Sequence, residues 1–544
     1  MKKLKLFISI LLMLTFFILP VSTTPTSKTT NEVSIPLSNS NPKSISMKMP
    51  GKTFEFIKST SFTHIKAKDK NYYYKIKDKN EILANLRVTI RTIDNGDKFI
   101  FTRITNYSKQ NIYTDLIIPL SNTTTYNLEK YSDRGKIIRQ HDHVFGIDPT
   151  SYPIGVLNTY NKNQTVASMM LGKNYISKQL VKRYSKTRAS YVREFFEETD
   201  NYKIYLNSKT KSTFINLNLK TQSNSIGESW VLISNQPLFK NKNNMDYWMK
   251  RSIEEYISTH KWLTADGPYF KLPWSIEPAT KMGFGRNLGY MQGDDFVSTY
   301  SFTKERFFYN MIINSLADLD VFSHGEIRNN KVGVFQTEYT STWLKREYGI
   351  TAPYIDTRHN EYIALFLKKA GTTLNINNLK NANLIYADFL VKQVAIGNTI
   401  NLESGYLIND YFSTDGKKTH VSLNHVLGEM RFLLDAYKQT KNQKYLNVAM
   451  QIRKGVESLG TKWLREDGDT WYQVNRDLKF SGRDYKLLTL GDLLYSQKSW
   501  EEVGYKRSPV FDILIKSKYK YLTNINYPIK PNILNELKHQ GFIQ

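Results

Sequence analysis

The sequence of 544 residues contains no cysteine. Disulfide bonds, thiolate zinc sites, iron–sulfur clusters and cysteine nucleophiles are therefore excluded. Histidine is also scarce, with nine residues, which is few for a metal site. The sequence has no Gly-rich phosphate loop, no H-E-x-x-H motif and no G-x-S-x-G motif. We therefore expect neither a metal nor another cofactor.

Acidic residues are outnumbered, since 76 Lys and Arg oppose 49 Asp and Glu and leave a net charge of +27. This excess fits either a polyanionic partner or a lysine-rich composition. If a partner explains it, basic residues should line the mouth of the functional domain. The hydrophobic fraction of 40% excludes a mainly disordered chain, and the length predicts two or three folded units.

The first residues have the layout of an export signal. Three lysines precede an apolar run from Leu6 to Leu19, which Pro20 ends. At about 1.5 Å per residue this run reaches only about 21 Å, short of the roughly 30 Å membrane core. Residues 1–23 are therefore predicted to be a cleaved signal peptide, with an N-terminal membrane anchor as the alternative. We expect a secreted protein, or one on the outer face of the membrane or cell wall, and no nucleic-acid partner.

The next segments change from linker to strand patterns. Residues 24–52 are rich in Ser, Thr, Asn, Pro and Lys, which predicts a flexible linker. Residues 53–240 alternate with period two, and the turn residues Asp94–Asp97 separate two such runs and predict a hairpin. Several further runs predict a β-rich domain, sandwich-like, with no catalytic signature.

Residues 241–544 follow the helical period instead. Apolar stripes predict three helices, and a Ser-Pro pair predicts the start of a fourth. These four stripes lie at Phe308–Leu319, Leu423–Leu434, Tyr445–Ile452 and Val510–Ile515. Long aromatic loops between helical hairpins favour an (α/α) barrel or toroid, although an ordinary helical bundle fits the pattern as well. The fold class is therefore α+β and multidomain.

Tyrosine is abundant, with 36 residues, many of them in loops of the helical half beside basic residues. The clusters are Tyr354–His359, Asn409–Tyr411, Trp471–Arg476 and Gly482–Tyr485. A tyrosine acts as a base only if positive charge lowers its pKa from about 10. One reaction that needs such a base is proton abstraction beside the carboxylate of a uronic acid. The alternative for each tyrosine is that it packs, or stacks on a sugar ring.

Four segments of the helical half, three of them from these clusters, resemble in order the C-terminal domain of the D-glucuronyl C5-epimerase family over about residues 405–523. They are Asn409–Phe412 with the helix start that follows, Tyr472–Arg476, Arg483–Tyr485 and Ser508–Phe511. The resemblance implies an (α/α) barrel behind β-rich domains. It also implies that Tyr411, Tyr472 and Tyr485 are catalytic, with Asp410 as an acidic partner. Where the family has two histidines after its last tyrosine, this sequence has Lys486–Thr489.

The leading hypothesis is an exported isomerase, a C5-epimerase of uronic acid residues in an acidic polysaccharide. Tyr485 or Tyr472 would abstract the C5 proton and Tyr411 would return one. Four further residues are expected to bind the substrate beside Asp410, with the arginines neutralising its carboxylate. They are Arg476, Arg483, Arg358 and His359.

Three alternatives remain open. A polysaccharide lyase begins with the same proton abstraction. A glycoside hydrolase needs two carboxylates about 5 to 9.5 Å apart, for which four residues are candidates: Glu338, Asp356, Glu403 and Asp410. The last alternative is a non-catalytic, cell-wall glycan-binding protein. The sequence leaves the oligomeric state and the identity of the polysaccharide open.

Overall fold

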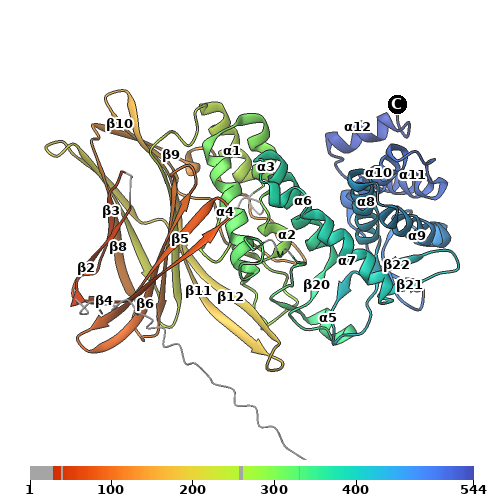
Figure 1. Ribbon diagram of the computed structural model, residues 1–544, viewed down its shortest axis with the longest axis horizontal. Helices are drawn as coiled ribbons and strands as arrows, with labels where there is room; N and C mark the ends of the chain where they lie inside the picture. Colours follow the sequence, from red (N-terminus) through yellow and green to blue (C-terminus); the bar gives the residue numbers. More distant parts are fainter. Residues whose placement is uncertain (1–28, 38–40, 256–260, 330, 332) are drawn as a thin grey trace, which may run out of the picture.

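The computed structural model describes residues 29–37, 41–255, 261–329, 331 and 333–544 (Figure 1). The predicted signal or anchor at residues 1–23 lies outside this part, and export stays a prediction. Within the described ranges, no helix combines the length and the apolar character needed to cross a membrane.

Two antiparallel sheets make up the N-terminal half and face each other across a hydrophobic core (Figure 1). The larger sheet has, in spatial order, β1 (Thr29–Thr30), β4 (Thr53–His64), β5 (Ala67–Asp78), β6 (Glu81–Ile93), β7 (Lys98–Asn106), β15 (Ile226–Ser234), β11 (Gln164–Arg183), β12 (Ala189–Thr199), β18 (Gly283–Gly285) and β16 (Phe270–Lys271), with β10 (Gly155–Asn161) and β9 (Thr125–Lys130) on a branch from β11. The smaller sheet has β13 (Tyr202–Asn207), β14 (Ser212–Thr221), β8 (Ile112–Ser121), β3 (Ser44–Lys48) and β2 (Glu32–Pro36). The predicted sandwich-like region is confirmed.

The period-two pattern explains this core. In β6, Leu86, Val88 and Ile90 lie on one face and are buried between the sheets. The turn that follows closes a hairpin, since the Ile93 amide donates to the Asp97 carbonyl oxygen over 2.8 Å and β6 pairs with β7. The predicted hairpin at residues 94–97 is confirmed.

The predicted linker at residues 24–52 is wrong where the structure describes strands. Ile35 of β2 and Ile45 and Met47 of β3 are buried in the core of the sandwich. A short alternation of apolar side chains is sufficient to form a strand inside this Ser- and Thr-rich segment, because the neighbouring strand β8 supplies backbone hydrogen bonds to β3. Composition alone hides this alternation.

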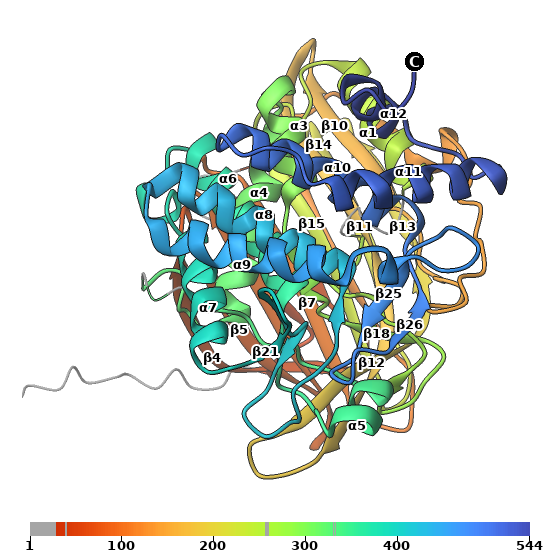
Figure 2. The same cartoon turned by 90° about the vertical axis from the view of Figure 1, so that its right-hand side faces the viewer.

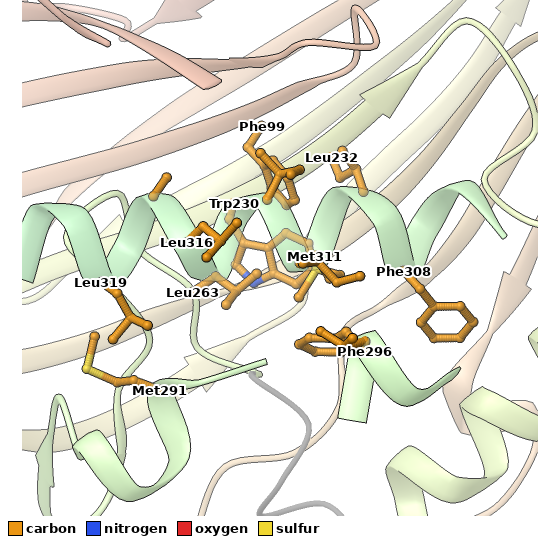
Figure 3. Close-up of a cluster of buried hydrophobic side chains, with 14 of the residues drawn as sticks. Phe99, Trp230, Leu232, Leu263, Met291, Phe296, Phe308, Met311, Leu316 and Leu319 are labelled. Carbon is orange, nitrogen blue, oxygen red and sulfur yellow. The ribbon is translucent and has the colours of Figure 1, made fainter. Parts of the chain in front are cut away.

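Helices cover the other face of the larger sheet. They are α1 (Lys242–Glu254), α2 (Leu288–Met291), α3 (Asp294–Thr303) and α4 (Arg306–Phe322). Figure 3 shows Phe99, Trp230 and Leu232 of the sheet in one cluster with Phe308 and Met311 of α4. The predicted boundary between residues 240 and 241 is therefore wrong, because sheet and helices share one core and β16 and β18 join the sheet.

The rest of the chain is a series of helical hairpins. The helices are α5 (Thr342–Tyr348), α6 (Thr357–Thr373), α7 (Asn383–Ala395), α8 (Leu423–Thr440), α9 (Gln443–Leu459), α10 (Lys486–Glu502), α11 (Pro509–Asn524) and α12 (Pro531–His539). Figure 2 shows α8 and α9 side by side, with α10 and α11 above them. The four predicted helices correspond to α4, α8, α9 and α11. The hairpins α6–α7, α8–α9 and α10–α11 form an arc, so the predicted toroid is shown only in part.

Short strands join the ends of these helices. They are β17 (Ile276–Glu277) with β19 (Thr340–Ser341), β20 (Ile355–Asp356) with β23 (Tyr411–Phe412), β21 (Thr399–Asn401) with β22 (Tyr406–Ile408), and β24 (Val421–Ser422) with β25 (Trp471–Val474) and β26 (Phe480–Arg483). Because β20, β24 and β26 each lead into a helix, they bring the beginnings of α6, α8 and α10 to one end of the arc.

Candidate active site

Three helices begin at this end of the arc, and one of them, α6, is capped by a side chain. Asp356 is the N-cap of α6, and its carboxylate accepts a hydrogen bond of 3.0 Å from the His359 amide. Ser422 occupies the N-cap position of α8 and Tyr485 that of α10. Helix N-termini carry a partial positive charge, so an anionic group is favoured where they meet.

The three predicted tyrosines meet at this place. The rings of Tyr472 and Tyr485 are 5.7 Å apart and nearly perpendicular. Tyr411 and Tyr472 are joined through His420, whose ring lies 5.8 Å from the first and 6.4 Å from the second. Residues separated by more than 70 positions in the sequence thus form one aromatic cluster, which we call the tyrosine cluster (Tyr411, Tyr472 and Tyr485).

The electrostatics of this cluster differ from the expectation. Burial and the nearby Asp356 carboxylate raise the pKa of Tyr411 well above its usual value. Burial and Tyr485 do the same to the pKa of Tyr472. Tyr485 is 53% exposed, and partial burial together with Tyr290 raises its pKa to about 12. The expectation that neighbouring cations lower these pKa values is therefore wrong, and all three phenols are protonated at neutral pH.

Asp410 lies beneath the cluster and is fully buried. Its carboxylate accepts hydrogen bonds from the Ser422 amide over 2.8 Å and from the Ser422 hydroxyl. His420 Nε2 lies 3.2 Å from one of its oxygens and His425 Nδ1 lies 3.9 Å from the other. Burial alone would raise the pKa of Asp410, but His425 and His420 outweigh burial and lower it. Asp410 thus lies within 4 Å of a ring nitrogen of each of two histidines.

His359 and His425 lie at the third position of their helices, each after a capping residue. A hydrogen bond of 2.9 Å joins His425 Nδ1 to the Thr357 hydroxyl. Burial lowers the pKa of His359. Its Nδ1 lies 3.7 Å from Asp356 and makes no hydrogen bond within the described ranges. His359 is therefore neutral at neutral pH and able to accept a proton.

The three predicted arginines do not contact the cluster. Arg358 is buried and already paired with Glu361 at 2.8 Å and with Asp492 at 3.2 Å. Arg483 lies directly opposite Trp471, and since side chains alternate along a strand it occupies the face opposite Tyr472. Arg476 is exposed and donates to the Thr399 carbonyl oxygen over 3.1 Å.

The floor of the site contains a buried carboxyl group. Glu429 of α8 is 1% exposed, and neither of its carboxyl oxygens has a hydrogen-bond partner in the described part of the chain. Burial and the nearby Asp410 raise its pKa well above its usual value. Burial thus favours the neutral form of the Glu429 carboxyl group.

Of the four carboxylates considered for a hydrolase, only Asp356 and Asp410 lie at this place. Glu338 forms an ion pair with Arg286 elsewhere in the chain. Glu403 is exposed in the turn between β21 and β22. Among the described residues, no group of three or more His, Asp or Glu side chains is arranged to hold a metal ion.

Comparisons with known proteins identify no family. No family model matches this chain, and no curated protein matches it. Among solved structures, a cellobiose 2-epimerase from Bacillus thermoamylovorans is 14% identical, with 53% of this chain and 70% of that chain covered and a TM-score of 0.36.

Two further solved structures match at similar levels. A family 76 glycoside hydrolase from a bovine Bacteroides thetaiotaomicron strain is 11% identical, with 65% and 75% covered and a TM-score of 0.35. An unsaturated glucuronyl hydrolase from a Bacillus species is 11% identical, with 44% and 57% covered and a TM-score of 0.30. At these scores the matches carry no argument about activity, which has to be argued from the site itself.

Sequence reasoning selected the tyrosines but missed the role of His425. A signal was available, because Asp356-Thr-Arg-His359 and Ser422-Leu-Asn-His425 share one pattern of a capping residue followed three positions later by histidine. Glu429 gave no such signal, since a glutamate in an amphipathic helix is usually exposed.

Proposed function

We propose that this chain is a carbohydrate-active enzyme that epimerises uronic acid residues of an acidic polysaccharide at C5. The observation that carries the proposal is the meeting of three protonated tyrosines with two histidines, His359 and His425, at the beginnings of α6, α8 and α10. This set contains both a proton acceptor and proton donors, which epimerisation requires.

The protonation states assign the roles. A neutral histidine accepts the C5 proton, and the electron pair left on C5 moves into the adjacent carboxylate. A tyrosine on the opposite face of the ring then donates its phenolic proton to C5, which inverts the centre. Proton transfer from the histidinium to the tyrosinate restores the starting state, so protons and charge balance.

The negative charge that develops on the carboxylate needs stabilisation. The three paired or distant arginines do not supply it in this arrangement. The beginnings of α6, α8 and α10 offer partial positive charge at the same place. The high pKa values of the tyrosines favour hydrogen-bond donation to this carboxylate over ionisation.

Proton exchange with solvent tests the proposal. The full chain is incubated in deuterated water with a polysaccharide of alternating glucuronate and N-acetylglucosamine. Deuterium at C5 without chain cleavage is the expected result. Unsaturated ends that absorb in the ultraviolet would instead identify a lyase, and new reducing ends without unsaturation a hydrolase. Binding without any of these changes would favour the non-catalytic alternative.

The place of action is part of the proposal. We propose that the enzyme works outside the membrane, because the first residues have the layout of an export signal. Expression of the full chain in a bacterial host, followed by sequencing of the exported protein's N-terminus, tests this and distinguishes a cleaved signal from an anchor. Retention of the intact chain in the cytosol would contradict it.

A further inference from the structure

A cavity of about 700 Å³ lies beside the tyrosine cluster, between α2, α3 and one face of α6. Its lining residues are Tyr290, Gln292, Asp294, Asp295, Tyr362, Leu365, Lys368, Lys369, Thr372 and Thr373. The cavity is close to the site, since Gly289, the neighbour of Tyr290 on α2, lies against the ring of His359, and α6 carries both His359 and Tyr362. A ligand bound at the cluster could therefore continue into this cavity.

Two aromatic rings of the cavity are held in place by contacts with neighbouring side chains. Arg358 Nε donates a hydrogen bond of 3.0 Å to the Tyr362 hydroxyl, and the guanidinium lies 5.0 Å from the ring centre. Tyr290 packs on Phe270 with ring centres 5.6 Å apart and remains 36% exposed. Exposed, preoriented aromatic faces are suited to the C–H faces of a pyranose ring.

The charges of the cavity leave one cation without a partner. The Asp294 carboxylate pairs with Lys369 at 2.9 Å, and the Asp295 carboxylate pairs with Arg251 at 3.1 Å. The Lys368 ammonium has no ion-pair or hydrogen-bond partner among the residues that the structure describes. Both aspartates are thus paired, and although the lining carries no net charge, Lys368 is the lining cation that the described residues leave free for an anionic group.

We propose that this cavity binds a second sugar residue of the polysaccharide, stacked on Tyr290 and Tyr362, whose carboxylate pairs with Lys368. This assignment rests on the proposed function for the choice of polysaccharide. It adds a recognition site outside the tyrosine cluster and makes the substrate a chain with several carboxylates rather than a single uronic acid. The Lys368 stem lies on the same face of α6 as Tyr362 and Leu365, so one helix face presents ring contact and charge together.

Binding of a defined oligosaccharide tests this assignment without turnover. The probe is a tetrasaccharide of alternating glucuronate and N-acetylglucosamine, and its carboxyl-reduced form is the neutral comparison. Titration calorimetry compares the full chain with the variants Lys368→Gln, Tyr290→Ala and Lys392→Gln. Lys392 is the matched control, because it is an exposed lysine of a neighbouring helix, α7, outside the cavity lining.

The expected results separate charge from stacking. Lys368→Gln should weaken binding of the acidic probe about tenfold and leave the reduced probe unchanged. Tyr290→Ala should weaken both probes by a similar factor, and Lys392→Gln neither. Equal binding of both probes by the unmodified chain, equal effects of the two lysine variants, or no binding at all would overturn the assignment.

Failure of this assignment is distinguishable from failure of the proposed function. If the probes bind as expected but no deuterium enters C5, the cavity assignment holds and the epimerase proposal fails. If deuterium enters C5 while Lys368→Gln binds both probes like the unmodified chain, the epimerase proposal holds and the cavity assignment fails.

Discussion

Two clusters of buried polar side chains can be compared in this molecule. One lies between the larger sheet and α4 and is centred on Arg91. The other forms the floor of the candidate active site and is centred on Glu429. Both are shielded from water, yet they differ in how completely their charges and hydrogen-bonding atoms find partners.

Around Arg91 every side-chain N–H group has a partner, although Nε2 of the neighbouring His64 makes no hydrogen bond within the described part of the chain. The side chain is fully buried, and its five N–H groups donate to Asp69, Asn314, Asp318 and the Ala265 carbonyl oxygen over 2.5 to 3.0 Å. The neighbouring His64 lies between Asp320, at 2.6 Å, and Asp69, at 3.3 Å. Burial opposes the ionised form of Asp69, but Arg91 and His64 outweigh it and lower the pKa to about 2.

The floor of the site is incomplete by contrast. Both oxygens of Glu429, Nδ1 of His359 and Nε2 of His420 are buried and lack hydrogen bonds within the described part. A buried polar atom without a partner costs about 1 to 3 kcal/mol of stability. The comparison teaches that the sheet–helix cluster is built for stability, whereas the site keeps groups available for proton transfer and substrate at a cost in stability.

The largest effect is expected from a substitution that disrupts the cluster around Arg91. Arg91→Leu should lower the free energy of unfolding by about 3 to 5 kcal/mol, because Asp69 and Asp318 then remain buried without their cation. Urea unfolding measures the change. Arg346→Leu is the control, since Arg346 is 72% exposed and its removal should change stability by less than about 0.5 kcal/mol. A similar loss in both variants would contradict the structural role of the Arg91 cluster.

The second prediction concerns the site. Tyr472→Phe removes one proton donor and keeps the ring contact with Tyr485, so turnover should fall about 100-fold or more with little change in stability. Deuterium incorporation at C5 and thermal unfolding are the two measurements. Tyr247→Phe serves as control, because Tyr247 is 64% exposed on α1. Full turnover of the triple variant of Tyr411, Tyr472 and Tyr485 would remove the mechanism.

The third prediction concerns how the stability cost of the buried Glu429 depends on pH. Glu429 has a raised pKa when folded and an ordinary value of 4.5 when unfolded. The cost of keeping Glu429 protonated is therefore absent below pH 4.5, and it grows by about 1.4 kcal/mol for each pH unit from there up to the folded-state pKa. Glu429→Gln should match the unmodified chain at pH 4.5 and exceed its stability at pH 7.5. Equal stability differences at both pH values, measured by urea unfolding, would show that Glu429 is ionised.

The smallest expected effect concerns the arginines outside the cluster. Arg476→Gln and Arg483→Gln should each change kcat/KM by less than about twofold, because neither side chain faces the tyrosines. Steady-state assays on the same polysaccharide check this. A tenfold loss in either variant would restore that arginine as a partner of the substrate carboxylate.

The sequence predicted those features that depend on local patterns. The alternation at Leu86–Ile90 predicted a strand, the stripe at Leu423–Leu434 predicted α8, and Ser508 predicted the start of α11. The three tyrosines were predicted from the resemblance to the D-glucuronyl C5-epimerase family, whose segments occur in this sequence in the same order. The charge excess was less informative, because the cavity beside the site is lined by two lysines and two aspartates rather than by an excess of basic residues.

The sequence by itself determined where several strands and the four predicted helices form, because period, capping and turn chemistry act over a few residues. Only the tertiary structure decided the protonation states of the tyrosines, the pairing of Arg358 and the burial of Glu429. His64 and Asp320 are 256 positions apart yet hydrogen-bonded. Such properties depend on which side chains shield one another from water. This shielding is set only when segments that are distant in the sequence pack together.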